Sequence, residues 1–257
     1  MFLVEQKNRR PCGGGSLPNV NADSNALLLD IDGTIIDIAP TPDAVSVPDS
    51  LKLHLSRIQA RLSGALALVS GRSIAAIDVL FAPLRFCAIG CHGAEIRRGA
   101  AQAIETEGPA ISSSAKARFA EIGSLDPRIR IEDKYFTLAI HYRLVPELEN
   151  IIFGMVHERL AMSNEDLRVL CGKDVIEIET GDFSKGTGLR KLMEHAPFNG
   201  RRPIYLGDDT TDEYAFAVLP EFGGIGVSVG FMLPGAQACS QTPSEVRRWL
   251  AEIAEPS

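Results

Sequence analysis

Short apolar runs alternate along the chain with stretches in which apolar residues recur at helical spacing. The strand-like runs are residues 26–29, 65–69, 86–89, 203–206 and 224–229. After the first run, leucine and isoleucine recur with the period of a helix over residues 49–62, with Asp49 as its expected cap. Strands that alternate with helices indicate an α/β fold, in which helices wrap a parallel sheet.

The pattern changes over residues 105–180, where two helical stretches accompany several short strands, such as residues 136–142 and 174–178. This segment predicts a compact α+β insertion. The first 25 residues show no hydrophobic periodicity, and we expect a flexible tail there. The predicted organisation is a tail at 1–25, a core domain at 26–104 and 181–257, and an inserted domain at 105–180.

Composition excludes several classes of protein. The 257 residues are 45% hydrophobic and carry a net charge of −7, which argues against nucleic-acid binding. No apolar run approaches the roughly 20 residues of a membrane-spanning helix. The five cysteines are scattered and lack metal-binding pairs, so we expect reduced thiols in a cytoplasmic protein.

Two acidic motifs follow strand-like runs. Asp30-Ile31-Asp32-Gly33-Thr34 follows the first run, and residues 207–213 (GDDTTDE) follow residues 203–206. Taken alone, the first motif is an ordinary Asp/Gly turn, and the second is an acidic helix start capped by Thr211 or Asp212. Together they favour a catalytic edge, because strand ends in open α/β sheets carry the chemistry and clustered carboxylates need a cation. Oxygen ligands indicate Mg²⁺.

Two further side chains suit an anionic substrate. Ser70 ends the second strand-like run, and Lys185 begins a predicted helix. A hydroxyl and an ammonium group can both donate to phosphoryl oxygens. Each is common in an ordinary turn or at a solvated helix start, and their order along the chain carries the signal.

With these four motifs in order, the sequence resembles the haloacid dehalogenase superfamily of phosphatases. The resemblance implies a Rossmann-like parallel-sheet core with an inserted α+β cap. It further implies that Asp30 is the nucleophile, that Asp32 is the acid and base, and that Ser70 and Lys185 bind the phosphoryl group. Asp30, the backbone carbonyl of Asp32, and Asp208 would hold Mg²⁺, with Asp212 steadying the site or binding a metal-bound water.

A narrower resemblance rests on residues 90–95 (GCHGAE) and 132–143 (EDKYFTLAIHYR). These segments are similar to those of the trehalose-6-phosphate phosphatase family. The resemblance implies a mobile cap at 105–180 and hydrolysis of trehalose 6-phosphate supplied by a synthase. The residues that it implies in substrate binding are Gly71, Arg72, His92, Glu132, Lys134 and Glu177.

Alternatives remain open at this stage. Residues 132–134 also suit a charged turn, and His92 also suits a bracing role in its loop. Residues 179–183 differ from the family's usual link before Ser184. The substrate alternatives are another sugar phosphate, a non-catalytic sugar-phosphate-binding regulator, and a phosphotransferase. The expected partner is a small sugar phosphate, with neither nucleic acid nor membrane, and a monomer is favoured.

Overall fold

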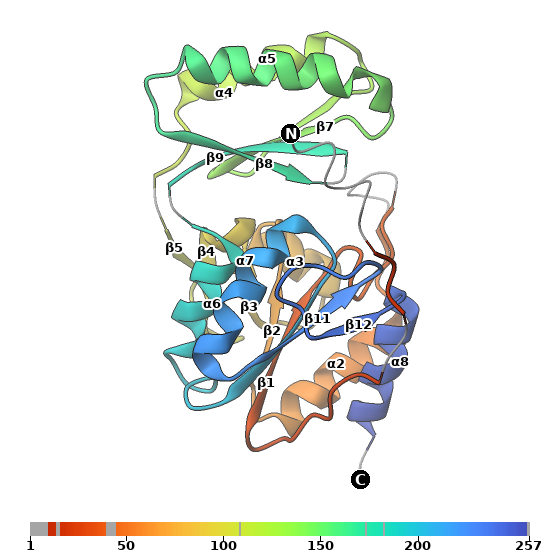
Figure 1. Cartoon of the computed structure of the whole chain (residues 1–257). Coiled ribbons are helices and arrows are strands. Elements are labelled where there is room, and N and C mark those ends of the chain that lie inside the picture. The colour runs from red at the N-terminus through yellow and green to blue at the C-terminus, as the bar shows by residue number, and fades with distance from the viewer. Residues whose placement is uncertain are drawn as a thin grey trace. The chain divides into compact units, whose positions relative to one another are not determined.

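The chain, seen as a computed structural model, is described over residues 10–13, 16–39, 45–107, 109–172, 174–181 and 183–255. It divides into two compact units (Figure 1). Unit 1 comprises Met1–Glu105 and Ser184–Ser257, and unit 2 comprises Thr106–Phe183. The insertion expected at residues 105–180 overlaps unit 2, whereas its role as a cap stays a prediction.

An eight-stranded sheet forms the centre of unit 1, in the order β12-β11-β10-β1-β2-β3-β4-β5. Its strands are β1 (Asn25–Asp30), β2 (Leu66–Val69), β3 (Cys87–Gly90), β4 (Glu95–Arg97), β5 (Glu105–Thr106), β10 (Arg202–Gly207), β11 (Ile225–Val229) and β12 (Ala238–Ser240). Neighbours from β12 to β3 run parallel, and β4 pairs antiparallel with β3. Every residue of β1 is buried, as expected of a strand covered on both faces.

Helices cover both faces of this sheet. They are α2 (Asp49–Arg61), α3 (Ile74–Phe81), α6 (Lys185–Met193), α7 (Thr210–Val218) and α8 (Pro243–Ala254), with the 3₁₀ turns η3 (Cys91–Gly93) and η6 (Leu219–Phe222). Figure 1 shows α2 beside α8 and α6 beside α7, and both pairs are in contact. The expected cap of α2 is wrong: Pro48 takes the cap position and Asp49 is the first helical residue, where its charge favours the helix dipole. None of the helices in the described part of the chain has the length and apolar character to span a membrane.

Unit 2 has a four-stranded antiparallel sheet with one apolar face and one polar face. Its strands, in the order β6-β7-β9-β8, are β6 (Arg130–Asp133), β7 (Thr137–His141), β9 (Val175–Thr180) and β8 (Leu167–Gly172), and its helices are α4 (Ser113–Ala120), η4 (Glu121–Ser124), η5 (Pro146–Leu148) and α5 (Glu149–Ala161). Leu138 and Ile178 pack with the helices in one apolar cluster. Because side chains alternate along strands, Glu177 and Glu179 lie on the opposite face. This second face, which includes Glu132 and His141, is the polar face of unit 2.

The described part of the first 25 residues differs from the expected flexible tail. The backbone N–H of Cys12 donates to the carbonyl of Gly230 at 3.1 Å, and Trp249 Nε1 donates to the carbonyl of Pro18 at 3.2 Å. Cys12 is therefore hydrogen-bonded to the residue that follows β11, and Pro18 is hydrogen-bonded to α8. Residues 1–9, 14 and 15 lie outside the described residues.

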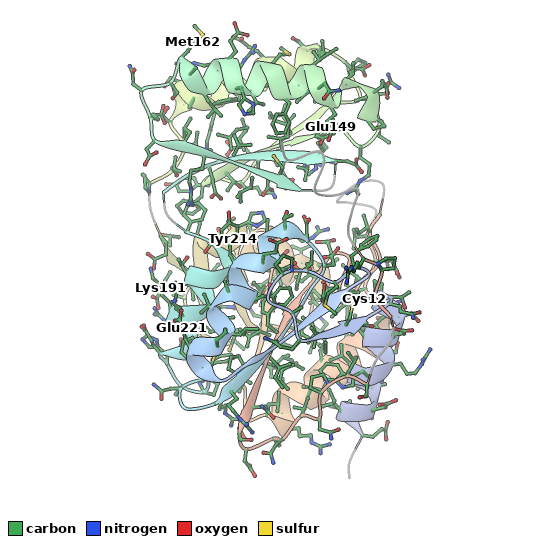
Figure 2. All side chains as sticks on the ribbon, in the orientation of Figure 1. Cys12, Glu149, Met162, Lys191, Tyr214 and Glu221 are labelled. Carbon is green, nitrogen blue, oxygen red and sulfur yellow. A yellow bond between two sulfur atoms is a disulfide. The ribbon has the colours of Figure 1, made fainter. Side chains whose placement is uncertain are left out.

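The prediction of reduced thiols is wrong for two of the five cysteines. Cys12, labelled in Figure 2, forms a disulfide with Cys239 of β12, while Cys87, Cys91 and Cys171 are free. The fold places the Cα atoms of the pair 5.5 Å apart although 227 positions separate them, a proximity that spacing does not reveal. The cytoplasmic location consequently loses its support from cysteine usage and stays a prediction.

Candidate active site

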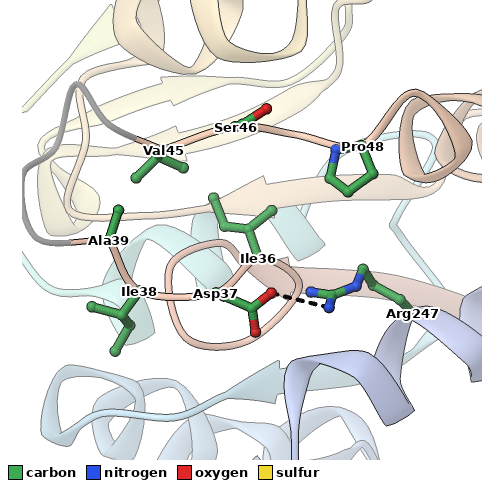
Figure 3. Close-up of a pocket in the computed structure, with 8 residues that line it drawn as sticks. All are labelled: Ile36, Asp37, Ile38, Ala39, Val45, Ser46, Pro48 and Arg247. Carbon is green, nitrogen blue, oxygen red and sulfur yellow. Dashed lines mark hydrogen bonds and ion pairs between the residues drawn. The ribbon is translucent and has the colours of Figure 1, made fainter.

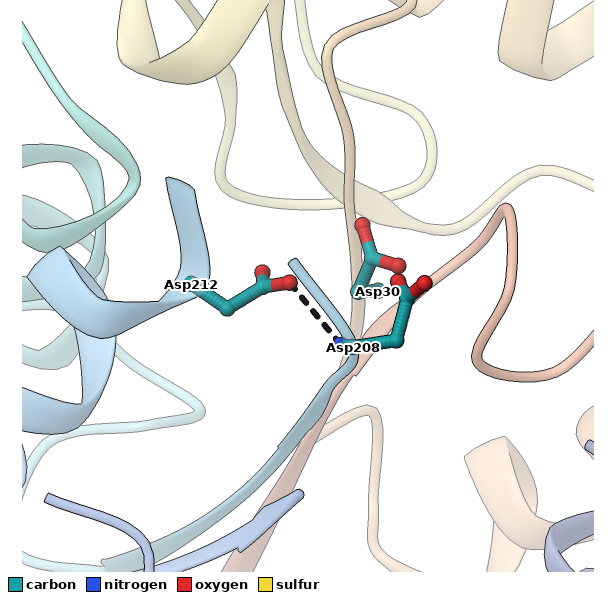
Figure 4. Close-up of side chains that lie close together, drawn as sticks. All are labelled: Asp30, Asp208 and Asp212. Carbon is teal, nitrogen blue, oxygen red and sulfur yellow. Dashed lines mark hydrogen bonds between the residues drawn. The ribbon is translucent and has the colours of Figure 1, made fainter. Parts of the chain in front are cut away.

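The predicted catalytic carboxylates meet at one edge of the unit 1 sheet. Asp30 ends β1 and Asp208 directly follows β10, and these two strands pair in parallel with Leu29 opposite Leu206. Parallel pairing brings both carboxyl ends to the same edge, which is where open α/β sheets place their ligands. Figure 4 shows Asp212, from the first turn of α7, beside them.

Lys185 lies between two of these carboxylates. Its Nζ donates to Asp30 Oδ1 at 2.8 Å and to Asp212 Oδ1 at 2.6 Å. The side chains of all three residues are at most 6% exposed. Such short, charge-assisted hydrogen bonds fix the lysine at the reacting edge.

Thr34 is a site residue that the sequence did not single out. Its Oγ1 donates to Asp30 Oδ2 at 2.8 Å and lies 3.3 Å from Asp208 Oδ1. Its presence in the first acidic motif was the available signal. Gly33 precedes it at φ +85°, and a Cβ there would lie 2.1 Å from Asp208 Oδ2, so the close approach of the two motifs requires glycine.

The electrostatics of the cluster indicate an excess of negative charge. Burial raises the pKa of Asp30 to about 7, even though Lys185 opposes the shift. Burial, followed by the charge of Asp30, also raises the pKa of Asp208 well above its usual value. Burial disfavours the Lys185 ammonium, but Asp212 and Asp30 outweigh burial and raise its pKa. One lysine therefore faces more negative charge than it neutralises.

A divalent cation fits this set of residues. Asp30, Asp208 and Asp212 can each offer one oxygen, and these oxygens lie within 4.8 Å of one another. Carboxylate oxygens are the ligands that Mg²⁺ and Ca²⁺ prefer, and a cation would supply the missing positive charge. The carboxylate of Asp32 is not part of this set. The resemblance implies only the backbone carbonyl of Asp32 as a metal ligand, and that role stays a prediction.

The carboxylate of Asp32 is held by Arg72. Arg72 Nε donates to Asp32 Oδ2 at 2.6 Å and its Nη2 donates to Oδ1 at 2.8 Å. This paired geometry joins the ends of β1 and β2 and orients the predicted acid and base. Arg72 was expected in substrate binding, and that role stays a prediction.

Ser70, Gly71 and His92 lie close together beside Arg72. Ser70 is buried at the end of β2, and its Oγ accepts the backbone N–H of Arg72 at 3.1 Å. The backbone N–H of His92 donates to the carbonyl of Ser70 at 3.1 Å. A Cβ at Gly71 would lie 2.4 Å from His92 Nε2, so the imidazole occupies the space that glycine leaves. Both roles of His92, bracing of its loop and contact with the substrate, stay predictions.

The start of α7 differs from the expected caps Thr211 and Asp212. Asp209 is the N-cap residue and Asp212 is the third helical residue, and together they form a capping box. Asp212 Oδ2 accepts the backbone N–H groups of Asp208 and Asp209, each at 3.0 Å. The acidic motif thus serves both the helix start and the carboxylate cluster.

The three predicted sugar-binding residues lie together in unit 2. Lys134 forms a buried ion pair with Glu177, and Glu132 Oε2 lies 2.8 Å from His141 Nε2. The hydrogen bond with His141 lowers the pKa of Glu132. Glu132 and Glu177 both register with Ala139 of β7, so a small residue separates two carboxylates on the polar face.

A separate pocket is lined by the loop that follows the first acidic motif (Figure 3). Its lining residues are Ile36, Asp37, Ile38, Ala39, Val45, Ser46, Pro48 and Arg247. Arg247 of α8 donates to the carbonyl of Ile35 at 3.2 Å and to Asp37 Oδ2 at 3.0 Å. None of the predicted site residues lines this pocket. The hydrogen bonds of Arg247 anchor the loop after Thr34 to α8.

Comparison with known proteins gives consistent results. The trehalose-phosphatase family model matches residues 28–244. A probable trehalose-phosphate phosphatase of Sinorhizobium fredii is 37% identical over 226 residues, covering 88% of this chain and 85% of that protein. Trehalose-6-phosphate phosphatase of Escherichia coli is also 37% identical, over 80% of this chain and 77% of that protein.

Solved structures share the fold. The C-terminal domain of C. albicans trehalose-6-phosphate phosphatase matches with a TM-score of 0.79 at 21% identity, covering 96% of this chain and 99% of that one. A protein described as related to trehalose-6-phosphate phosphatase matches with a TM-score of 0.66 at 23% identity, covering 89% and 96%. The predicted α/β fold class and the predicted family are confirmed. This chain belongs to the trehalose-phosphatase family.

Proposed function

We propose that this protein hydrolyses trehalose 6-phosphate to trehalose and phosphate, with Mg²⁺ as cofactor. The observation that carries the proposal is the buried cluster in which Lys185 bridges Asp30 and Asp212 beside Asp208. A nucleophilic carboxylate, a fixed ammonium group and oxygen ligands for a cation are the requirements of phosphoryl transfer through an aspartyl-phosphate. The names of the relatives from S. fredii and E. coli support trehalose 6-phosphate as the substrate.

The first step forms a bond between a carboxylate oxygen of Asp30 and phosphorus. The bond between phosphorus and the sugar oxygen breaks, and Asp32 gives its proton to that oxygen, so trehalose leaves. Lys185 and Ser70 donate hydrogen bonds to the phosphoryl oxygens, and Arg72 orients Asp32. Mg²⁺ bound to Asp30, Asp208 and the Asp32 carbonyl would neutralise charge on the phosphoryl group.

The second step restores the enzyme. Asp32, now ionised, accepts a proton from water, and the water oxygen bonds to phosphorus while the bond to Asp30 breaks. Phosphate is released, and Asp32 is again protonated for the next cycle. Two displacements replace one difficult displacement, which is the advantage of covalent catalysis.

We assign recognition of the sugar to Glu132, Lys134 and Glu177. A disaccharide offers hydroxyl groups that donate to carboxylates and accept from an ammonium group. The three side chains already exchange such hydrogen bonds among themselves and with His141. Sugar hydroxyls would take the place of these hydrogen bonds, so that each charged group keeps a hydrogen-bond partner.

The test is phosphate release from trehalose 6-phosphate, sucrose 6-phosphate, glucose 6-phosphate and p-nitrophenyl phosphate, with and without Mg²⁺. Asp30→Asn should lower kcat at least about 10³-fold, because the amide is a poor nucleophile. Asp37→Asn is the matched control, since Asp37 lies in the same loop but contacts Arg247, away from the cluster.

Strong preference for trehalose 6-phosphate that requires Mg²⁺ and Asp30 would support the whole proposal. Equal rates on several sugar phosphates would keep the chemistry and reject the substrate. No release from any of them would favour a regulator that binds sugar phosphates without turnover.

A further inference from the structure

One buried hydroxyl group touches the catalytic cluster and has no part in the mechanism above. Tyr205 lies in β10 with no solvent exposure, and its OH donates to Asp212 Oδ1 at 2.5 Å. In the sequence it is one more residue of an apolar run, and nothing in the pattern distinguishes it from its neighbours. Burial and the charge of Asp212 raise its pKa well above the usual value, which keeps the hydroxyl a donor.

Asp212 is fully supplied with hydrogen bonds when Tyr205 is included. Its Oδ1 accepts from Tyr205 and from Lys185, and its Oδ2 accepts from two backbone N–H groups. A carboxylate has about four acceptor positions, so these four donors fill them, and a direct bond from Asp212 to a cation would have to displace one of them. The arrangement suits a carboxylate that anchors its neighbours rather than one that reacts.

Packing holds the tyrosine ring in place. The rings of Tyr205 and Phe216 meet edge to face, with centroids 5.5 Å apart and an interplanar angle of 86°. Phe216 lies in α7 and is fully buried as well. The hydroxyl group therefore has a fixed direction, set by a strand and a helix of the same unit.

We propose that Tyr205 is a positioning residue that makes Lys185 available to the phosphoryl group. By donating to Oδ1, the phenol satisfies part of the charge of Asp212, so Lys185 is shared between Asp212 and Asp30. Lys185 already lies closer to Asp212, at 2.6 Å, than to Asp30, at 2.8 Å. Without the phenol, Asp212 attracts the ammonium group more strongly and draws it away from the reacting atoms. This inference rests on the phosphoryl-binding role of Lys185 in the proposed function.

The test is Tyr205→Phe, which removes one oxygen and keeps the ring. We expect kcat to fall about tenfold and KM to change less than twofold, because the lost hydrogen bond acts on the reacting group and not on the sugar. The affinity for inorganic phosphate with Mg²⁺, measured by calorimetry without turnover, should fall about threefold or more, as expected when Lys185 withdraws.

Tyr142→Phe is the matched control. Tyr142 is also buried, and its OH donates to Glu149 Oε1 at 2.9 Å within unit 2. Removing it should lower the melting temperature to a similar extent and leave kcat and phosphate affinity unchanged. A merely structural role for Tyr205 predicts that both variants behave alike.

The inference is overturned if Tyr205→Phe retains kcat and phosphate affinity within twofold of the wild type, or if Tyr142→Phe loses as much of both. If the wild type hydrolyses no sugar phosphate, the proposed function fails, and the ratio of phosphate affinities still decides the positioning of Lys185. Should Tyr205→Phe not fold, Phe216→Leu loosens the same ring. It should lower kcat severalfold at unchanged KM, and wild-type kcat would refute the idea.

Discussion

The two units arrange buried charge in different ways. In unit 1, Lys185 is surrounded by Asp30, Asp212 and the nearby Asp208, so negative charge is in excess. In unit 2, the two buried carboxylates each have a basic partner: Glu177 pairs with the buried Lys134, and Glu179 pairs with Arg168, whose side chain is 40% exposed. Both arrangements are costly to bury, and they differ in what they still require from outside.

The difference separates two kinds of chemistry. An excess of carboxylates has a net charge that a cation can neutralise, and it includes the proposed nucleophile Asp30, whose pKa burial has raised to about 7. Balanced pairs bind neutral groups better, because sugar hydroxyls can take over their hydrogen bonds without a change in net charge. Unit 1 is therefore suited to reaction with a phosphoryl group, and the polar face of unit 2 is suited to a sugar.

Removing the ammonium group from unit 1 should have the largest effect. In Lys185→Met, the buried carboxylates of Asp30 and Asp212 lose their positive partner, so we expect kcat to fall at least about 10³-fold. In the presence of a metal chelator, the free energy of unfolding should fall by about 3–5 kcal/mol at pH 8. It should fall by less at pH 6, where a larger fraction of Asp30 is protonated. Urea unfolding at both pH values measures this.

Lys191→Met is the control for that experiment, because Lys191 lies on the same helix, outside the carboxylate cluster. It should change neither kcat nor the pH dependence of unfolding. Equal losses in the two variants would mean that unit 1 has no special excess of charge.

Removing the corresponding ammonium group from unit 2 should affect binding and spare the reaction. In Lys134→Met, KM for trehalose 6-phosphate should rise about 10- to 100-fold, as expected for a lost hydrogen bond to a charged group. The rate with p-nitrophenyl phosphate, which has no sugar, should stay within twofold of the wild type. Steady-state kinetics on the two substrates makes this comparison.

Lys116→Met is the matched control in unit 2, since Lys116 pairs with the half-exposed Asp133. Lys116→Met should change neither KM for trehalose 6-phosphate nor the rate with p-nitrophenyl phosphate. A loss of p-nitrophenyl phosphate hydrolysis in Lys134→Met would contradict the division of roles between the two units.

The smallest effect on activity is expected when Glu179, the partner of Arg168, is replaced. The quantity that changes is the dependence of stability on pH. Burial raises the pKa of Glu179 from 4.5 to about 8, and Arg168 opposes this shift only in part. Between these values the folded state holds a proton that the unfolded state releases, so stability falls as pH rises. In Glu179→Gln, this loss, about 3–4 kcal/mol between pH 5 and 8 for a pKa shift of that size, should largely disappear.

Thermal unfolding across that range tests the point. Asp126→Asn is the control, because Arg128 lowers the pKa of Asp126 to about 2 and the group stays ionised above pH 5 in both states. The pH dependence of stability in Asp126→Asn should match that of the wild type. An unchanged slope in Glu179→Gln would show that Arg168 keeps Glu179 ionised.

Much of the active site could be predicted from the sequence because its residues sit at strand ends. A strand buried on both faces is an uninterrupted apolar run, so the positions of Asp30, Ser70 and Asp208 at strand ends followed from the pattern. Sheet topology then brings such ends together. The residue types gave the chemistry, and the order of motifs indicated the family.

Contacts between distant residues could not be predicted in the same way. Arg72 and Asp32 are 40 positions apart, and neither spacing nor residue type identifies them as partners. The cap of α7 was wrong by two or more positions, because Asp209, Thr211 and Asp212 are all plausible caps and backbone geometry selects among them. The same holds for Cys12 and Cys239, which form a disulfide although 227 positions separate them.

The sequence by itself determined the class of fold, the positions of the reactive side chains along the chain and the chemistry they support, since these depend on local patterns and residue types. Only the tertiary structure decided how many partners each charge has. It set Tyr205 and Lys185 on the same oxygen of Asp212, and it paired Lys134 with Glu177. The physical reason is that hydrogen bonds and desolvation depend on distances of a few ångströms between residues that lie far apart in the chain.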